Sequence, residues 1–376
     1  MMQILLTGAT GTIGSALVIE LLKNPQSRLT LLVRARDSDD LQQRMAAMHR
    51  FWGLQPGVDA AQRIEAVLGD IVLPDFGLRA ETLEHLAHNT THIIHCAASV
   101  KLNMSLDEAR TTAVKPTRSI LALARRCAAA GQLQKVDLVS TVGVWGRTPG
   151  HMPEQRLPQV TDFHNTYEAA KAEAERVVWA EGDGLPITVH RPSMVVGNAG
   201  DGKVIHFQVF YHLCEFLSGG RTFGVMPRLG STRLDTVPVD WVAQAIGWSS
   251  AHPETAGRIF HLCSGPAGAI SLPQLQQAVR QAWQRRGRKL PTLRPINQAW
   301  LERLIPLIGA VAGEKTRRAL RGLPPVLAYL AEDQGFTNTE SQHIFAAAGL
   351  PLPPVESYLQ PVLNHYLDTV AGRGRP

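Results

Sequence analysis

The 376-residue sequence is poor in the features that mark secreted, membrane-spanning and metal-clustered proteins. Its four cysteines, Cys96, Cys127, Cys214 and Cys263, lie far apart without a CxxC pair, which predicts reduced thiols. No apolar run approaches the ~18 residues of a spanning helix. The residues before Ile4 have neither the basic region nor the cleavage site of a signal peptide. We therefore expect a cytoplasmic protein with no transmembrane segment.

Strong charge is also absent. The net charge of +6 is mild, and no block of basic residues marks a nucleic-acid-binding arm, so no nucleic acid partner is expected. With 44% hydrophobic and 19% charged residues, the composition is typical of a globular protein with a substantial core. At roughly 100–200 residues per domain, the length predicts two domains or one elaborated domain. The oligomeric state is not indicated.

Segments of strand and helix character alternate through the first half of the chain. Strands are predicted at 3–7, 28–34, 63–68, 91–97, 135–140 and 186–191, and helices at 12–23, 40–51, 80–88, 106–130 and 167–180. Continuous apolar strands alternating with helices predict a parallel sheet covered on both faces. Right-handed crossovers then give an α/β fold of the Rossmann type, a doubly wound sheet with its ligand at the carboxyl ends of the strands.

The alternation stops after Arg191. An aromatic-rich helix is predicted at 204–217, and a helix at 237–249, a strand at 258–262 and a helix at 272–285 are interpreted as returns to the sheet. No further sheet pattern follows Ser264, and the later helices are predicted at 298–308, 326–333 and 354–371. We predict a Rossmann domain at 1–200 with returns at 234–264. A smaller, mostly helical substrate-binding part is predicted at 201–233 and 265–376.

A glycine-rich turn joins the first strand to the first helix. Gly8, Gly11 and Gly14 form G-x-x-G-x-x-G, which lets the backbone approach a pyrophosphate at a helix N-terminus. The alternative, a tight turn with packing glycines, is disfavoured because the motif has the strand–turn–helix context it requires. The predicted phosphate-binding residues are Gly8, Thr10, Gly11, Thr12, Ile13 and Gly14.

The end of the second strand indicates which dinucleotide is bound. NAD enzymes usually carry an acidic residue there, but this chain has Arg34, followed by Arg36 and, on the next helix, Arg44. Guanidinium groups hold a 2′-phosphate well, so NADP(H) is the predicted cofactor, although Arg36 and Arg44 could equally face water. Asp70 is expected to reach the adenine amino group, and Ile71 to cover the ring.

A Y-x-x-x-K pair supplies the candidate chemistry. Tyr167 and Lys171 share one helix face, and the ammonium is expected to lower the tyrosine's pKa from about 10, making the phenol a proton donor. The pair alone could be an exposed surface pair. The fifth strand, however, ends in Ser140 and Thr141, and a hydroxyl there would point into the same crevice.

Several stretches together resemble a known superfamily. They are TGATGTIG at 7–14, LLVRA at 31–35, GDI at 69–71, IHCAASV at 94–100, VST at 139–141, Y-x-x-x-K at 167–171 and HRPS at 190–193. Over about residues 1–264 the chain resembles the extended short-chain dehydrogenase/reductases, specifically the branch of thioester reductase domains and fatty acyl-CoA reductases of the male sterility type.

The resemblance adds roles to particular residues. It implies that Thr141 rather than Ser140 is the catalytic hydroxyl, beside Tyr167 and Lys171. It also implies that Arg191, Pro192 and Ser193 line the nicotinamide end of the site. The cofactor channel would then be lined by Ala97, Ala98 and Ser99.

By this resemblance the chain is an NADPH-dependent oxidoreductase. It would reduce an acyl thioester, carried by CoA or an acyl carrier protein, to an aldehyde, and the choice between stopping there and a second reduction to an alcohol is left open. One alternative is an extended short-chain dehydrogenase acting on another small molecule, such as an epimerase, a ketoreductase or a hydroxysteroid-type dehydrogenase. Another is a non-catalytic NADP-binding regulator, which the intact Thr141, Tyr167 and Lys171 set disfavours.

Three further patterns leave both a functional and a structural interpretation open. The helix at 204–217 and the C-terminal helices are predicted to wall an apolar channel for an acyl chain, although the helix could equally be a core element. Arg317, Arg318 and Arg321 could dock an acidic carrier protein, but a solvated helix face is favoured. His85, His88, His92 and His95 straddle different elements, so no metal site is expected.

Overall fold

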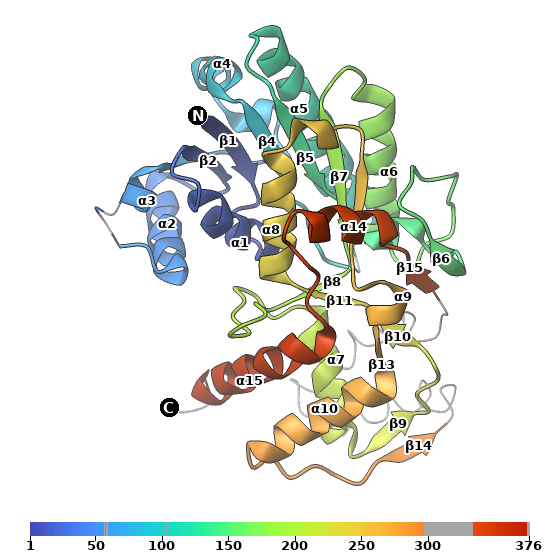
Figure 1. Ribbon diagram of the computed structural model, residues 1–376. Coiled ribbons are helices and arrows are strands. Elements are labelled where there is room, and N and C mark those ends of the chain that lie inside the picture. Colours follow the sequence, from blue (N-terminus) through green and yellow to red (C-terminus); the bar gives the residue numbers. More distant parts are fainter. Residues whose placement is uncertain (56, 58, 103, 297–333, 374–376) are drawn as a thin grey trace.

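The computed structural model describes residues 1–55, 57, 59–102, 104–296 and 334–373 (Figure 1). The predicted helices at 298–308 and 326–333, and the arginines at 317, 318 and 321, lie outside these residues.

A seven-stranded parallel sheet forms the centre of the fold. Its order is β12-β7-β5-β4-β1-β2-β3, with all neighbours parallel. The strands are β1 (Met2–Thr7), β2 (Ser27–Val33), β3 (Ile64–Leu68), β4 (His92–His95), β5 (Lys135–Val139), β7 (Ile187–Pro192) and β12 (Ile259–Leu262). The predicted Rossmann-type doubly wound sheet is confirmed, and the strand order reverses between β1 and β4, where such folds bind their ligand.

Helices cover both faces of the sheet (Figure 1). One face carries α1 (Thr12–Leu22), α2 (Ser38–Trp52) and α8 (Val239–Ser250), and the other carries α4 (Ala80–Asn89), α5 (Leu106–Ala129) and α6 (Thr166–Glu181). Short helical segments are α3 (Asp59–Gln62), η1 (Pro74–Gly77), η2 (Val142–Trp145) and η4 (Pro253–Thr255). Each layer has its own apolar core, and the strands are buried on both faces, which explains their continuous apolar sequences.

A second, helical unit lies beyond the carboxyl ends of the strands. It is built on α7 (Val209–Leu217), α10 (Leu272–Arg285) and α15 (Val355–Arg373), whose apolar side chains form a separate core. With these helices lie β8 (Met194–Val196), β9 (Val225–Pro227), β10 (Arg233–Leu234), β11 (Thr236–Pro238), β13 (Ile270–Ser271), β14 (Arg294–Ile296), η3 (Gly220–Thr222) and α9 (Gly265–Gly268). The strands among these elements form three two-stranded sheets, β8–β11, β9–β14 and β10–β13.

Two sequence expectations are wrong in this unit. Short strands do follow Ser264, namely β13, β14 and β15 (Gln334–Phe336). They were not predicted because segments of two or three residues are too short to show a strand pattern. The helix predicted at 204–217 spans only Val209–Leu217, and residues 204–208 before it form bends and irregular backbone. Helix α10, by contrast, spans the predicted 272–285, and its start is fixed by a capping box between Ser271 and Gln274.

The C-terminal segment returns to the sheet before it joins the helical unit. Strand β15 pairs in parallel with β6 (Gly150–Met152), which follows the candidate catalytic strand β5. Helix α14 (Thr339–Ala347) then packs on β12, and its Phe345 is buried between Trp241 and Phe260. Only after this does the chain enter α15, in the core of the helical unit.

Within the described residues, no helix has both the length and the apolar character needed to cross a membrane. The same part of the chain holds no group of three or more His, Cys, Asp or Glu side chains that could bind a metal ion.

Candidate active site

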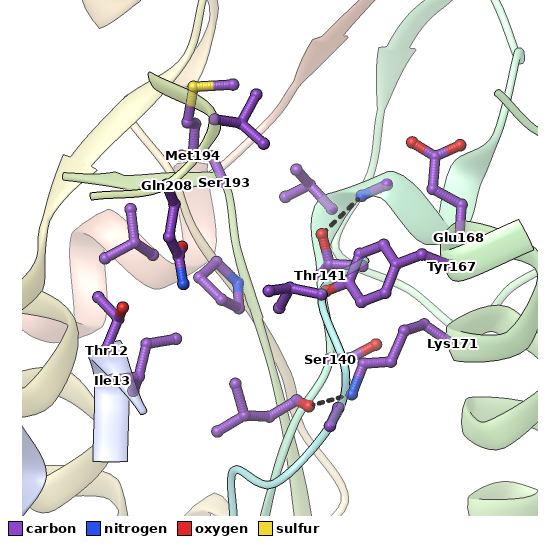
Figure 2. Close-up of a pocket in the computed structure, with 18 of the residues that line it drawn as sticks. Thr12, Ile13, Ser140, Thr141, Tyr167, Glu168, Lys171, Ser193, Met194 and Gln208 are labelled. Carbon is purple, nitrogen blue, oxygen red and sulfur yellow. Dashed lines mark hydrogen bonds between the residues drawn. The ribbon is translucent and has the colours of Figure 1, made fainter. Parts of the chain in front are cut away.

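A cavity of about 430 Å³ lies at the carboxyl ends of β1, β4, β5 and β7, between the sheet and the helical unit (Figure 2). One side consists of the glycine-rich loop, and Figure 2 shows Thr12 and Ile13 facing Thr141, Tyr167 and Lys171 across the space. The predicted site residues that line the cavity are Gly8, Gly11, Thr12, Ile13, Gly14, Ala98, Thr141, Tyr167, Lys171, Pro192 and Ser193.

The glycine-rich loop is shaped by close backbone contacts. Gly8 has φ = +78°, and a Cβ on it would lie 2.7 Å from the Ala97 nitrogen. A Cβ on Gly14 would lie 2.2 Å from the Gly8 carbonyl oxygen. Both glycines are therefore sterically required, and the loop leads directly into the N-terminus of α1. The residues present thus fit a dinucleotide, whose pyrophosphate would lie against this helix end.

The opposite wall brings the three candidate catalytic side chains together. Helix α6 is capped by Asn165, whose side chain accepts a hydrogen bond from the Glu168 amide, so that Tyr167 lies in the first turn. The Lys171 ammonium donates to the Val139 carbonyl (2.7 Å), which ties α6 to the end of β5. The Thr141 oxygen accepts from the Gly143 amide (3.2 Å), leaving its hydroxyl proton for another acceptor.

The expected lowering of the Tyr167 pKa is wrong for this structure. Burial raises the pKa of Tyr167 to about 12, the neighbouring Glu168 carboxylate adds to this, and a hydrogen bond with Thr141 opposes it. Burial lowers the pKa of Lys171 to about 8, while Cys96 and Glu175 act in the opposite direction. The charge of Lys171 is evident from the sequence, but the complete burial that disfavours the charged form of both groups is not.

Arg191 corrects a second expectation, because it does not line the cavity. Its side chain is fully buried and donates to both carboxylate oxygens of Glu175, with a 3.1 Å bond from Nε to Oε2. Glu175 also accepts from the Ser140 hydroxyl (2.9 Å), and the Arg191 guanidinium contacts the His261 ring nitrogen (3.1 Å). Arg191 thus supports the site from behind, which the RPS motif did not reveal.

The residues predicted for the adenine end follow the ends of β2 and β3, outside the cavity. Arg34 is exposed. Arg36 and Arg44 both approach the Asp40 carboxylate, at 3.4 and 3.3 Å, with side chains 81% and 47% exposed. Asp70 accepts from the Val72 amide (3.2 Å), and Ile71 packs against the core below α4 and α5.

Three other predicted cofactor residues, Ala97, Thr10 and Ser99, do not line the cavity. The Ala97 amide donates to the Thr7 hydroxyl (3.3 Å), and Ala97 contacts Gly8. The Thr10 carbonyl interacts with the His206 ring (3.2 Å). Ser99 accepts from the Lys101 amide (3.4 Å).

The helical unit contributes cavity residues that the sequence did not single out. They are Met194, Leu234 and Asp235, while the predicted stretch 204–217 contributes His206 and Gln208, and β15, paired with β6, contributes Gln334 and Phe336. Asp235 accepts from the amides of Ser264 (2.7 Å) and Gly265 (2.9 Å), and burial raises its pKa to about 6. Apart from the predicted stretch 204–217, these residues come from separate short segments without a motif, so no sequence pattern could have grouped them.

The predicted apolar channel is only partly realised. Helix α7 lines the cavity through Val209 and Phe210, while its other aromatic residues pack with α10 and α15. Helix α15 does not line the cavity; instead, β15 reaches it with Gln334 and Phe336. The core interpretation therefore applies to most of the aromatic helix, because a nine-residue helix between two others must bury most of its surface.

Fold and site together define the class: an oxidoreductase of the extended short-chain dehydrogenase/reductase type, with a nucleotide-binding Rossmann fold for a nicotinamide dinucleotide. The family model described as male sterility protein matches residues 6–246, more than half of the chain. The chain therefore belongs to the male sterility protein family, which confirms the resemblance seen in the sequence.

Individual relatives agree with this assignment. A non-canonical nonribosomal peptide synthetase, FrzA, from Cladobotryum sp is 27% identical over 99% of this chain and 36% of its own length. An isonitrile lipopeptide synthase from Streptomyces coeruleorubidus is 30% identical over 65% of this chain and 16% of its own. This chain thus spans well under half of either synthetase.

Solved structures resemble the whole fold. The terminal R domain from the myxalamid PKS-NRPS biosynthetic pathway has a TM-score of 0.80 and 26% identity, with coverage of 99% of this chain and 91% of that one. A thiolation-reductase di-domain from an archaeal nonribosomal peptide synthetase has a TM-score of 0.76 and 20% identity, covering 98% and 76%. The likeness to the second structure concerns the fold alone.

Proposed function

We propose that this protein is an NADPH-dependent reductase of acyl thioesters presented by an acyl carrier protein. The observation that carries the proposal is the placement of Thr141, Tyr167 and Lys171 on one wall of a cavity whose other wall is the glycine-rich loop. The synthetase relatives and the R-domain structure support a carrier-bound substrate rather than a sugar or steroid.

When bound, the dinucleotide would supply a hydride to the thioester carbonyl carbon. Thr141 would donate its hydroxyl proton to the carbonyl oxygen in a hydrogen bond, and Tyr167 would protonate that oxygen as the C–H bond forms. Lys171 would hold the cofactor ribose and keep a positive charge beside the phenol. A tyrosine that is protonated throughout the neutral range suits the role of acid better than that of base.

Collapse of the resulting thiohemiacetal completes the first reduction. The hydroxyl returns its proton as the carbonyl re-forms, the C–S bond breaks, and the leaving thiolate takes a proton to give a free thiol and an aldehyde. Once a second NADPH has replaced the oxidised cofactor, Tyr167, protonated again from solvent, would protonate the aldehyde oxygen in a second reduction that gives an alcohol.

We further propose NADPH rather than NADH, with Arg34 as the main ligand of the 2′-phosphate and Asp70 and Ile71 at the adenine. We also propose a division into a Rossmann domain at 1–200 with returns at 234–264 and a substrate-binding part at 201–233 and 265–376. Helix α14 is an exception, because it lies within the second part of the sequence but packs on β12 of the sheet. Four free cysteines support a reducing, cytoplasmic compartment.

The test is an assay of NADPH oxidation against matched substrates. One acyl group is offered on a carrier protein, on CoA, as the free aldehyde and as a ketone, with a nucleotide sugar as a further arm. We expect the carrier-bound thioester to give the highest kcat/KM, with aldehyde or alcohol as product. Turnover of the ketone or the nucleotide sugar without turnover of any thioester would overturn the proposal.

A further inference from the structure

The segment between β8 and α7 lies across the glycine-rich loop and connects the helical unit to the Rossmann core. Near its start, the Lys203 ammonium donates to the Phe51 carbonyl (2.6 Å) and lies 4.5 Å from the centre of the Phe51 ring. Further along, the His206 ring interacts with the Thr10 carbonyl at 3.2 Å. The segment is therefore held against both α2 and the phosphate-binding loop.

Side chains alternate between two surroundings in the second half of this segment. His206 and Gln208 line the cavity. Phe207, between them, packs edge-on against Tyr211 (4.8 Å) and Tyr366 (4.9 Å) of the helical core. This aromatic anchor fixes the direction of its two neighbours.

Gln208 lines the cavity with a side-chain amide that can both donate and accept hydrogen bonds. In Figure 2 its side chain extends toward the side where Thr12 and Ile13 lie, across from Tyr167. Its backbone carbonyl accepts from the Tyr211 amide, but within the described residues its side-chain amide has no hydrogen-bond partner. An amide directed into a cavity without a protein partner is available to a ligand.

We propose that His206 and Gln208 form a clamp that binds the dinucleotide from the side of the helical unit. The His206 Nε2–H, which in the structure faces the Thr10 carbonyl, exchanges this acceptor for an oxygen of the pyrophosphate, and the Gln208 amide binds the nicotinamide half. The inference rests on the dinucleotide site of the proposed function. It adds two binding residues that belong to neither the glycine-rich motif nor the Y-x-x-x-K pair.

The first test compares His206→Ala with His212→Ala by titration calorimetry on the full chain. His212 is the matched control because it is an exposed histidine on α7 that does not line the cavity. We expect His206→Ala to weaken NADPH and NADH by the same factor, about tenfold, since the pyrophosphate is common to both. A change below about twofold, or an equal loss in His212→Ala, would overturn the assignment.

The second test uses Gln208→Leu and two probes. Adenosine 2′,5′-bisphosphate lacks the nicotinamide half, so its affinity should be unchanged, while NADPH should bind about three- to tenfold more weakly. An equal loss for both probes, or a loss for neither, would overturn the role of Gln208. A failure of the NADPH preference itself would leave these ratios intact, so the two proposals fail separately.

Discussion

The two ends of the candidate cofactor site use opposite physical environments. At the chemical end, Tyr167, Lys171 and the Glu175–Arg191 pair are buried, and burial raises the pKa of Tyr167 to about 12 and lowers that of Lys171 to about 8. At the predicted adenine end, Arg34, Arg36 and Arg44 are exposed. Charges in the buried end act strongly on one another, whereas solvent screens those in the exposed end.

This contrast implies a graded response to mutation. A change at the buried end should affect the reaction or the fold by large factors, because a buried group has no solvent to replace its partner. A change at the exposed end should alter cofactor affinity more modestly, because water and the neighbouring arginines compensate.

The largest effect is expected for Tyr167→Phe, which keeps the ring and removes the acid. We expect kcat to fall by roughly 10²–10⁴, with NADPH affinity little changed, in single-turnover kinetics and calorimetry. Near-full turnover in this variant would show that another group protonates the substrate, and the regulator hypothesis would gain weight.

Glu175→Gln should be the most damaging change to stability. Arg191 would lose a buried carboxylate partner, at a cost of about 3–5 kcal/mol in the free energy of unfolding. Glu173→Gln, two positions earlier on α6, is the control, because its bond to Arg110 is partly exposed and is worth about 1 kcal/mol or less. Denaturant unfolding of both variants measures the difference, and equal losses would contradict the contrast between buried and exposed pairs.

Arg34→Ala tests the exposed end. A charge-assisted bond to the 2′-phosphate is worth about 1.5–3 kcal/mol, so NADPH should bind roughly 10–150-fold more weakly. NADH affinity should stay constant, and Arg36→Ala should have the smaller effect, because the Arg36 side chain is 81% exposed and is already paired with Asp40. Equal affinity of the wild-type chain for NADPH and NADH would remove Arg34 from this role.

The pH dependence of kcat/KM tests whether the buried charge of Lys171 is required. Because burial lowers the pKa of Lys171 to about 8, its positive charge is present below pH 8 and is lost above it. We expect kcat/KM to fall about tenfold per pH unit above that value. A plateau extending to pH 10 would mean that Lys171 keeps its charge or that the charge is not required.

The smallest effect concerns the acyl group. Each methylene buried in the cavity contributes about 0.8 kcal/mol, or roughly fourfold in kcat/KM. Since a cavity of about 430 Å³ must hold both the nicotinamide and the acyl end, we expect the rise with chain length to stop early. A continuous rise through long acyl chains would indicate a channel beyond the described cavity, and a flat profile would contradict the acyl assignment.

What the sequence predicted follows the same division between local and distant interactions. The glycine-rich turn, the six strands and the Y-x-x-x-K pair are local patterns, and the structure has them where the periodicity and spacing placed them. Burial depends on contacts between distant segments, so neither the raised pKa of Tyr167 nor the burial of Arg191 could be deduced from the sequence. The same holds for Phe336, whose approach to the cavity depends on the pairing of β15 with β6.

The path of the last described segment has a consequence for modular engineering. Residues 334–373 first pair with β6, then supply Phe345 to the sheet's core, and finally supply α15 to the helical core. The two units are therefore interleaved rather than consecutive. A chimera made with one crossover point would divide both hydrophobic cores, so exchange of substrate-binding units between family members requires at least two junctions, with α14 retained alongside the sheet it covers.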